Sequence, residues 1–157
     1  MKIELMVIGR TMSEYLRSGI DQYVSRLTRY VPFELHVLPD VKATKSMTET
    51  RQKEAEGQVF LSQLTAADAV ILLDERGREM TSREFSSFVE KKMVAGTKRL
   101  VFIVGGPYGF SQAMYDRADG LVSLSRMTFS HEMVRLFFVE QLYRAFTILS
   151  NEPYHHD

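Results

Sequence analysis

The sequence contains no cysteine. This absence excludes disulfide bonds, catalysis by a thiolate and zinc sites built on cysteine. No apolar run approaches the ~18 residues that a membrane-spanning helix needs. The first residues, "MKIELMVIGR", read as a strand and lack the apolar core and cleavage site of a signal peptide. We therefore expect a cytoplasmic protein.

The chain also lacks a net charge, because 20 Lys and Arg residues balance 20 Asp and Glu residues. This balance disfavours a globally basic nucleic-acid-binding protein, but it leaves room for a local basic patch. With 157 residues, 45% of them hydrophobic and 25% charged, the composition is typical of a folded globular protein. A chain of this length is expected to form a single domain over residues 1–157.

Apolar periodicity predicts strands that alternate with helices. Strands are expected over residues 2–9, 33–38, 69–74, 99–106 and 120–125. Helices are expected over 12–30, 46–64, 81–96, 111–119 and 131–149, with a loop over 40–48 and a turn at "ERGRE", 75–79. This order favours an α/β fold with a mostly parallel sheet flanked by helices.

The last predicted helix is apolar around nearly its whole circumference, although a helix at a protein surface needs only one apolar stripe. Its apolar side chains include Met133, Val134, Leu136, Phe137, Phe138, Val139, Leu142, Tyr143, Phe146, Ile148 and Leu149. Either the helix is central in the monomer, or a second copy of the chain covers its other stripe. We favour the second copy, and therefore a homodimer.

The segment "VFIVGGPYGF", residues 101–110, leads from an apolar strand into three glycines and a proline. It is no P-loop, because no Lys-Ser or Lys-Thr follows, and its glycine spacing differs from the dinucleotide fingerprint. A plain turn, or a backbone lip against which a ligand lies, remains open. Two other predicted strands end in unusual loops, "LLDERG" (72–77) and "LSRMTFSHEMVR" (124–135). Because ligands of α/β proteins bind at the carboxyl ends of strands, the three loops together favour a ligand site.

The motifs "GGPYGF", "LSRMTFSHEMVR", "EQLYRAF" and the terminal "PYHH" occur in this order. Together they resemble the ribosomal RNA large-subunit methyltransferase H family, which belongs to the SPOUT class of knotted methyltransferases. The resemblance implies an alpha/beta knot with a trefoil-knotted C-terminal region, an exception to the usual rule against knots. It also implies a homodimer that uses S-adenosylmethionine (SAM) to methylate N3 of a pseudouridine in 23S rRNA on the assembled ribosome.

The resemblance further implies roles for individual residues, with no metal. The cofactor would lie against Leu73, Gly105, Gly106, Leu124, Ser125, Arg126, Met127, Thr128 and Phe129. The catalytic candidates are Arg144, Tyr154 and His155, and the candidates for contact with the rRNA are His131 and Arg135. Arg144 can stabilise charge that develops on the carbonyl oxygens of the base, and His155 has the side chain best suited to accept a proton near neutral pH.

The residues themselves leave other interpretations open. Arg144 is spaced for an ion pair with Glu140, His131 can be structural, and the tail can be frayed. A non-catalytic protein that binds the ribosome is the alternative function. Two positions depart from the family pattern: Ser130 stands where proline is usual, and His156 where Lys or Arg is usual. Serine is a good N-cap, so we expect the helix to begin there all the same.

Overall fold

The computed structural model describes residues 1–42 and 46–157, so positions 43–45 of the loop predicted over 40–48 lie outside the described residues. Within these described residues, five strands and five helices alternate. The strands are β1 (Lys2–Ile8), β2 (Phe33–Leu38), β3 (Ala69–Glu79), β4 (Arg99–Val104) and β5 (Gly120–Ser123). The helices are α1 (Glu14–Leu27), α2 (Glu49–Leu61), α3 (Ser82–Val94), α4 (Gln112–Arg117) and α5 (His131–Leu149).

The strands form one sheet in the order β2-β1-β4-β3-β5, and every pair of neighbours in it is parallel. The α/β class and the parallel sheet predicted from the sequence are therefore confirmed. Parallel strands require crossover connections, and each helix from α1 to α4 provides one. The carboxyl ends of β3, β4 and β5 consequently meet at one edge of the sheet.

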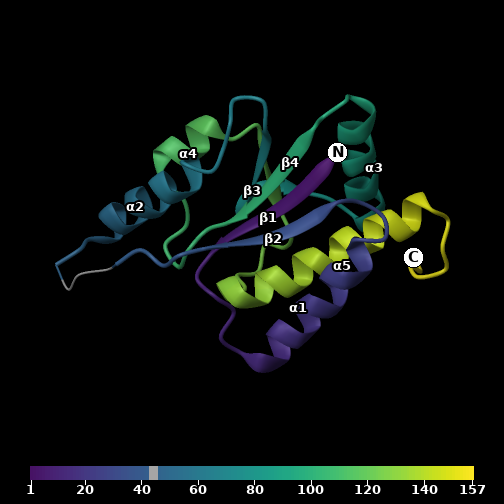
Figure 1. The fold of residues 1–157 in the computed structure, drawn as a ribbon, viewed down its shortest axis with the longest axis horizontal. Coiled ribbons are helices and arrows are strands. Elements are labelled where there is room, and N and C mark those ends of the chain that lie inside the picture. The colour runs from purple at the N-terminus through teal and green to yellow at the C-terminus, as the bar shows by residue number, and fades with distance from the viewer. Residues whose placement is uncertain (43–45) are drawn as a thin grey trace.

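Helices cover both faces of the sheet (Figure 1). Helix α5 packs beside α1 and α3 on one face, and α2 packs beside α4 on the other. The first face holds a core that includes Leu5, Phe102 and Phe138, and the second holds a core that includes Met6, Phe60 and Ile103. Because both faces are covered, the central strands carry apolar side chains on both sides and do not alternate. Glu4 of β1 is an exception: it is buried and forms an ion pair with Arg99 of β4.

Capping residues that can be read from the sequence mark the beginnings of helices α3 and α5. Thr81 and Glu84 form a capping box at the start of α3, with each side chain bonded to the other residue's main-chain N–H. At the start of α5, the Oγ of Ser130 accepts a hydrogen bond from the Met133 N–H at 3.2 Å. The expectation that serine in place of proline preserves this helix start is confirmed.

The turn predicted at 75–79 is wrong, because β3 continues through these residues to Glu79. The pairing of β3 with β5 shifts its register between Leu73 and Arg78, as at a bulge. Gly77 makes the close approach possible: a Cβ there would lie 2.6 Å from the main-chain nitrogen of Val122. The bulge residues Asp74, Glu75 and Arg76 therefore stay beside the sheet edge and do not leave it as a free turn.

Helix α5 buries one face fully and leaves part of the other accessible. Phe138 is completely buried and its ring lies 4.7 Å from that of Phe102, whereas Phe137 keeps 39% of its surface exposed. Within the monomer α5 is thus a covered helix with an apolar side chain left at the surface. Among residues 1–42 and 46–157, no helix is both long and apolar enough to cross a membrane.

Candidate cofactor and active site

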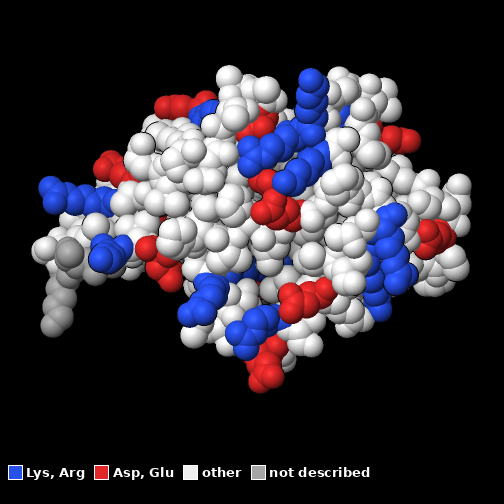
Figure 2. Space-filling model, in the orientation of Figure 1, with Lys and Arg blue, Asp and Glu red and all other residues white. Residues whose placement is uncertain are grey.

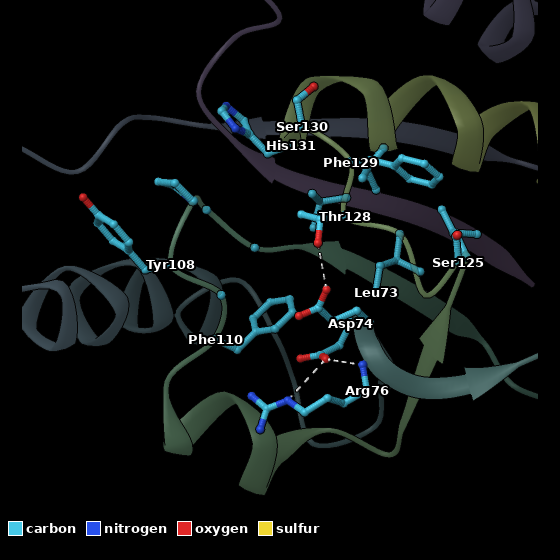
Figure 3. A pocket seen from close by; sticks show the side chains of 18 of the residues that line it. Leu73, Asp74, Arg76, Tyr108, Phe110, Ser125, Thr128, Phe129, Ser130 and His131 are labelled. Carbon is cyan, nitrogen blue, oxygen red and sulfur yellow. Dashed lines mark hydrogen bonds and ion pairs between the residues drawn. The ribbon is translucent and has the colours of Figure 1, made fainter.

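The loops that follow β4 and β5 and the bulge of β3 line a single cavity of about 490 Å³ (Figure 3). It is lined by Leu73–Arg76 from β3, by residues 104–110 after β4, and by the segment from Leu124 into the first turn of α5. Its volume lies within the range of about 300–1,000 Å³ that small-molecule sites occupy. The three loops that the sequence singled out thus meet at the carboxyl edge of the sheet.

Asp74 forms the polar wall of this cavity on the β3 side. Its side chain is only 7% exposed, and its Oδ1 accepts a hydrogen bond from the Arg76 N–H at 2.8 Å. Its Oδ2 accepts a second hydrogen bond from the hydroxyl of Tyr115. Burial, followed by this bond to Asp74, raises the pKa of Tyr115, so the phenol keeps its proton and remains a donor.

The glycine loop presents main chain to the cavity, but its glycines serve different contacts. A Cβ on Gly105 would lie 3.2 Å from the ring of Phe110, which lines the cavity. A Cβ on Gly106 would meet the carboxyl group of Glu56 on α2, 2.7 Å from its Oε1. At Gly106 the missing side chain makes room for Glu56, a contact that the sequence did not indicate. Gly106 also lines the cavity, and its role toward a ligand stays a prediction.

The segment after β5 is held by its own hydroxyl groups. Ser123 Oγ donates to the Ser125 carbonyl at 2.9 Å, and Ser125 Oγ accepts from the Met127 N–H at 2.9 Å. Thr128 Oγ1 donates to Glu75 Oε2 at 3.2 Å and so connects this segment to the bulge of β3 (Figure 3). The Phe129 ring lies 4.9 Å from that of Phe137.

Eight of the nine predicted cofactor residues line the cavity: Leu73, Gly105, Gly106, Leu124, Ser125, Met127, Thr128 and Phe129. Arg126 does not. Its side chain is 84% exposed and lies 3.5 Å from Glu79 Oε1, on the outside of the loop. The lining residues that sequence reasoning missed include Asp74, Tyr108 and Tyr115. Asp74 follows an apolar strand directly, which is a signal that could have identified it.

Of the two predicted rRNA contacts, only His131 has an accessible side chain. It is exposed, begins α5 and lines the cavity. Arg135 is 1% exposed and donates to the carbonyl oxygens of Ile8 and Gly9 and to Thr11 Oγ1. Burial lowers its pKa, as expected for a guanidinium whose three acceptors are all neutral. The role of Arg135 in RNA binding is therefore corrected: it attaches α5 to the end of β1.

The three predicted catalytic residues gather around Glu140 near the C-terminal end of α5. Glu140 Oε1 accepts from Arg144 Nη2 at 2.6 Å and from the Tyr154 hydroxyl at 2.9 Å. The Arg144 guanidinium also lies over the Tyr154 ring, 4.7 Å from its centre. Burial, with hydrogen bonds to Tyr23 and Glu140, raises the pKa of Tyr154. We call Glu140, Arg144, Tyr154 and His155 the tail cluster.

The tail is folded against the body, so the frayed alternative is wrong. His155 Nδ1 accepts from Arg144 Nη1 at 3.1 Å, and its Nε2 lies 3.0 Å from Asp157 Oδ1. The Arg83 guanidinium and His155 lower the pKa of Asp157 to about 2. Since arginine only donates, His155 Nδ1 must be the acceptor, and both ring nitrogens are engaged. Within one subunit His155 therefore orients Arg144 and has no free nitrogen to accept a proton.

The cavity and the tail cluster lie at opposite ends of the same helix. His131 begins α5 and Arg144 follows 13 positions later in the numbering, which corresponds to roughly 20 Å along a helix. One subunit therefore does not bring its own catalytic candidates to its own cavity. The cavity has the size of a small-molecule site, and the tail cluster is a separate group of charged and aromatic side chains.

The parallel sheet with a cavity at its carboxyl edge places this chain among α/β proteins that bind small molecules there. Comparison with known proteins identifies the family. A family model described as "Predicted SPOUT methyltransferase" matches residues 1–155. A Ribosomal RNA large subunit methyltransferase H from Parabacteroides distasonis is 56% identical over 157 residues, all of both chains. Proteins with the same name from Flavobacterium johnsoniae (56% over 156 residues, 99% of each chain) and Porphyromonas gingivalis (53% over 157, all of both) are similarly close.

The chain belongs to the SPOUT methyltransferases and, within them, to the ribosomal RNA large subunit methyltransferase H family. The resemblance drawn from the four sequence motifs is confirmed. Family membership carries with it the alpha/beta knot and SAM as methyl donor.

Proposed function

We propose that this protein uses SAM to methylate N3 of a pseudouridine in 23S rRNA of the assembled ribosome. The observation that carries the proposal is the convergence of three loops on one cavity, in a chain that matches large-subunit rRNA methyltransferases over its full length. Fold alone would not suffice, because one fold supports many functions. In this proposal the residues of the cavity bind SAM, and those of the tail cluster contact the nucleobase.

The cavity fits the cofactor in size and in chemistry. Leu73 supplies an apolar wall for the adenine, and the main chain of residues 124–129 supplies N–H and C=O groups for its polar edge. Main-chain groups at Gly105 are accessible because no Cβ covers them. When bound, SAM supplies a methyl group attached to a sulfonium sulfur, which is a good leaving group. The protein therefore contributes mainly the alignment of this methyl group with N3.

The tail cluster serves the nucleobase. N3 of pseudouridine carries a proton and is flanked by two carbonyl groups, on which negative charge develops as this proton leaves. The Arg144 guanidinium, fixed by Glu140 and His155, can donate to such an oxygen. Tyr154 packs under this guanidinium and, with its raised pKa, serves as a hydrogen-bond donor and not as a base.

The two halves of the site meet only if two subunits are combined. We infer a homodimer in which the tail cluster of one subunit lies beside the cavity of the other. The roughly 20 Å along α5 between His131 and Arg144 supports this arrangement. So does the exposed Phe137, an apolar side chain on the same helix.

Recognition of RNA does not depend on a general excess of positive charge. Figure 2 shows Lys and Arg side chains in separate groups on the face in view, with Asp and Glu nearby, and the net charge is zero. Non-specific affinity for RNA is therefore weak, and the shape of the ribosome around the target supplies much of the recognition. We place the protein in the cytoplasm, where assembled ribosomes are found.

The test is methyl transfer from labelled SAM to whole 50S subunits or ribosomes that lack the modification, compared with free 23S rRNA. We expect incorporation into the particles, at one pseudouridine, and little into free RNA. Calorimetric titration with SAM should show saturable binding. A protein that binds ribosomes but neither binds SAM nor transfers methyl groups would contradict the proposal and favour the non-catalytic alternative.

A further inference from the structure

We propose that Asp74 and Glu75 make the cavity bind the positively charged cofactor more tightly than its neutral product. Methyl transfer then lowers the affinity of the cavity for the molecule that it holds. This inference rests on the proposed function. It assigns a role to two residues of the loop at 72–77 that are not among the cofactor residues implied by the family resemblance. The argument comes from the charges that line the cavity and from the change in charge during the reaction.

The cavity has an excess of negative charge. Its lining contains two carboxylates, Asp74 and Glu75, against one guanidinium, that of Arg76. The three charges are not equally screened by water. The Asp74 side chain is 7% exposed, whereas that of Arg76 is 77% exposed and lies over the Tyr115 ring, 5.4 Å from its centre. The Arg76 Nε lies 3.8 Å from Asp74 Oδ1 and offsets part of the charge of this carboxylate. Because an exposed charge is screened more than a buried one, the offset is incomplete, and the cavity keeps an excess of negative charge.

Asp74 is held in place by donors and still has acceptor capacity. It uses one oxygen for the Arg76 N–H and the other for the Tyr115 hydroxyl. A carboxylate offers about four acceptor positions, so these two bonds leave room for a ligand. Glu75, which also lines the cavity, is held by Thr128, whose Oγ1 donates a hydrogen bond to the Glu75 Oε2 at 3.2 Å. Both carboxylates are thus positioned before a ligand arrives.

The reaction changes the charge of the cofactor by one unit. The bond between sulfur and the methyl carbon breaks, its electron pair stays on sulfur, and the new bond forms to N3, whose proton passes to water. SAM carries a sulfonium, an ammonium and a carboxylate, with a net charge of +1. Its product, S-adenosylhomocysteine (SAH), is a neutral thioether with no net charge. A cavity lined by two carboxylates binds the first form more tightly than the second.

The experiment compares dissociation constants for SAM and SAH by calorimetry in the wild type, Asp74→Asn and Glu75→Gln. We expect the wild type to bind SAM about tenfold more tightly than SAH. Asp74→Asn should reduce this ratio by about fivefold, and Glu75→Gln by about twofold because Glu75 is exposed. The affinity for SAH should hardly change in either variant. Glu90→Gln, which removes an exposed carboxylate on α3 away from the cavity lining, serves as the matched control and should keep the wild-type ratio.

A cationic analogue that carries an ammonium in place of the sulfonium separates charge from contacts of the methyl group. It should follow SAM, and not SAH, through the series of variants. Equal loss of SAM and SAH affinity in both variants, or an unchanged ratio, would overturn the inference while leaving the proposed function intact. If Asp74→Asn fails to fold, Glu75→Gln alone decides. A wild type that binds neither compound would instead overturn the proposed function.

Discussion

Glu56 illustrates how one side chain connects the body of the protein to the cofactor loop. It is 6% exposed, its carboxyl group lies against Gly106, and its Oε1 has no hydrogen-bond partner among the described residues. Burial raises its pKa, Asp40 adds to the effect, and a hydrogen bond with Gln52 opposes it. The folded protein therefore disfavours the ionised form.

This raised pKa predicts a stability that depends on pH. Between the ordinary pKa of glutamate and the raised value, the folded state binds more protons than the unfolded state, so stability falls as pH rises. Glu56→Gln removes this loss. We expect its melting temperature to exceed that of the wild type by about 2–4 °C at pH 8 and to match it near pH 4. Melting curves from pH 4 to 8 measure this, with the exposed Glu54→Gln as control; a deficit at pH 8 would contradict the prediction.

Arg144 is the residue on which the proposed chemistry depends most. Arg144→Lys keeps the charge but loses the fork that reaches both Glu140 and His155. We expect methyl transfer to fall by about 100-fold, as when one donor to a developing oxyanion is removed, with SAM affinity unchanged within about twofold. Arg51→Lys, at an exposed position of α2, is the control. A parallel loss of SAM affinity and activity would show that Arg144 supports the cofactor cavity instead.

At the scale of elements, the predictions that held depend on nearby residues. The strands and helices follow from local periodicity, and the caps at Thr81 and Ser130 depend on residues three positions away. The contacts that the sequence did not indicate depend on distant partners. Arg135 is buried because the end of β1, about 125 positions earlier, offers carbonyl oxygens. Gly106 faces Glu56, which lies 50 positions away on another layer.

The bulge of β3 depends on the close approach of Gly77 to β5, and a substitution can test this dependence. Gly77→Ala would place a Cβ 2.6 Å from the main chain of Val122 and force β5 away from β3. Since β5 leads into Leu124 and the cavity, we expect a loss of stability of about 3 kcal/mol together with weaker SAM binding. Gly96→Ala is the comparison, because it has a positive φ but no atom within 4 Å of the added Cβ. It should cost about 1 kcal/mol from backbone strain alone and leave SAM binding intact. Similar effects of both variants in unfolding titrations would contradict this account of the bulge.

For the whole molecule, adjacent phenylalanines of α5 separate folding from assembly. Phe138 is completely buried, so Phe138→Asp places a charge in the core and should prevent folding. Phe137 is 39% exposed, so Phe137→Asp should give a folded protein that sediments as a monomer at micromolar concentration. A Phe137→Asp protein that remains dimeric would place the interface elsewhere, and a monomeric wild type would contradict the homodimer itself.

The central claim is that the cavity of one subunit works with the tail cluster of its partner. Two inactive proteins test it: a chain truncated after Asn151, which lacks Tyr154 and His155, and Gly105→Val, which forces a side chain against Phe110 at the cavity. Heterodimers, isolated with two different tags, contain one intact cavity opposite one intact tail.

Methyl transfer to ribosomes by these isolated heterodimers is the most direct measurement. The account predicts that they regain about half of the wild-type activity per dimer, since one of two symmetric sites is restored. Activity as low as that of either parent protein, in heterodimers of verified composition and normal fold, would show that each cavity depends on the tail of its own chain.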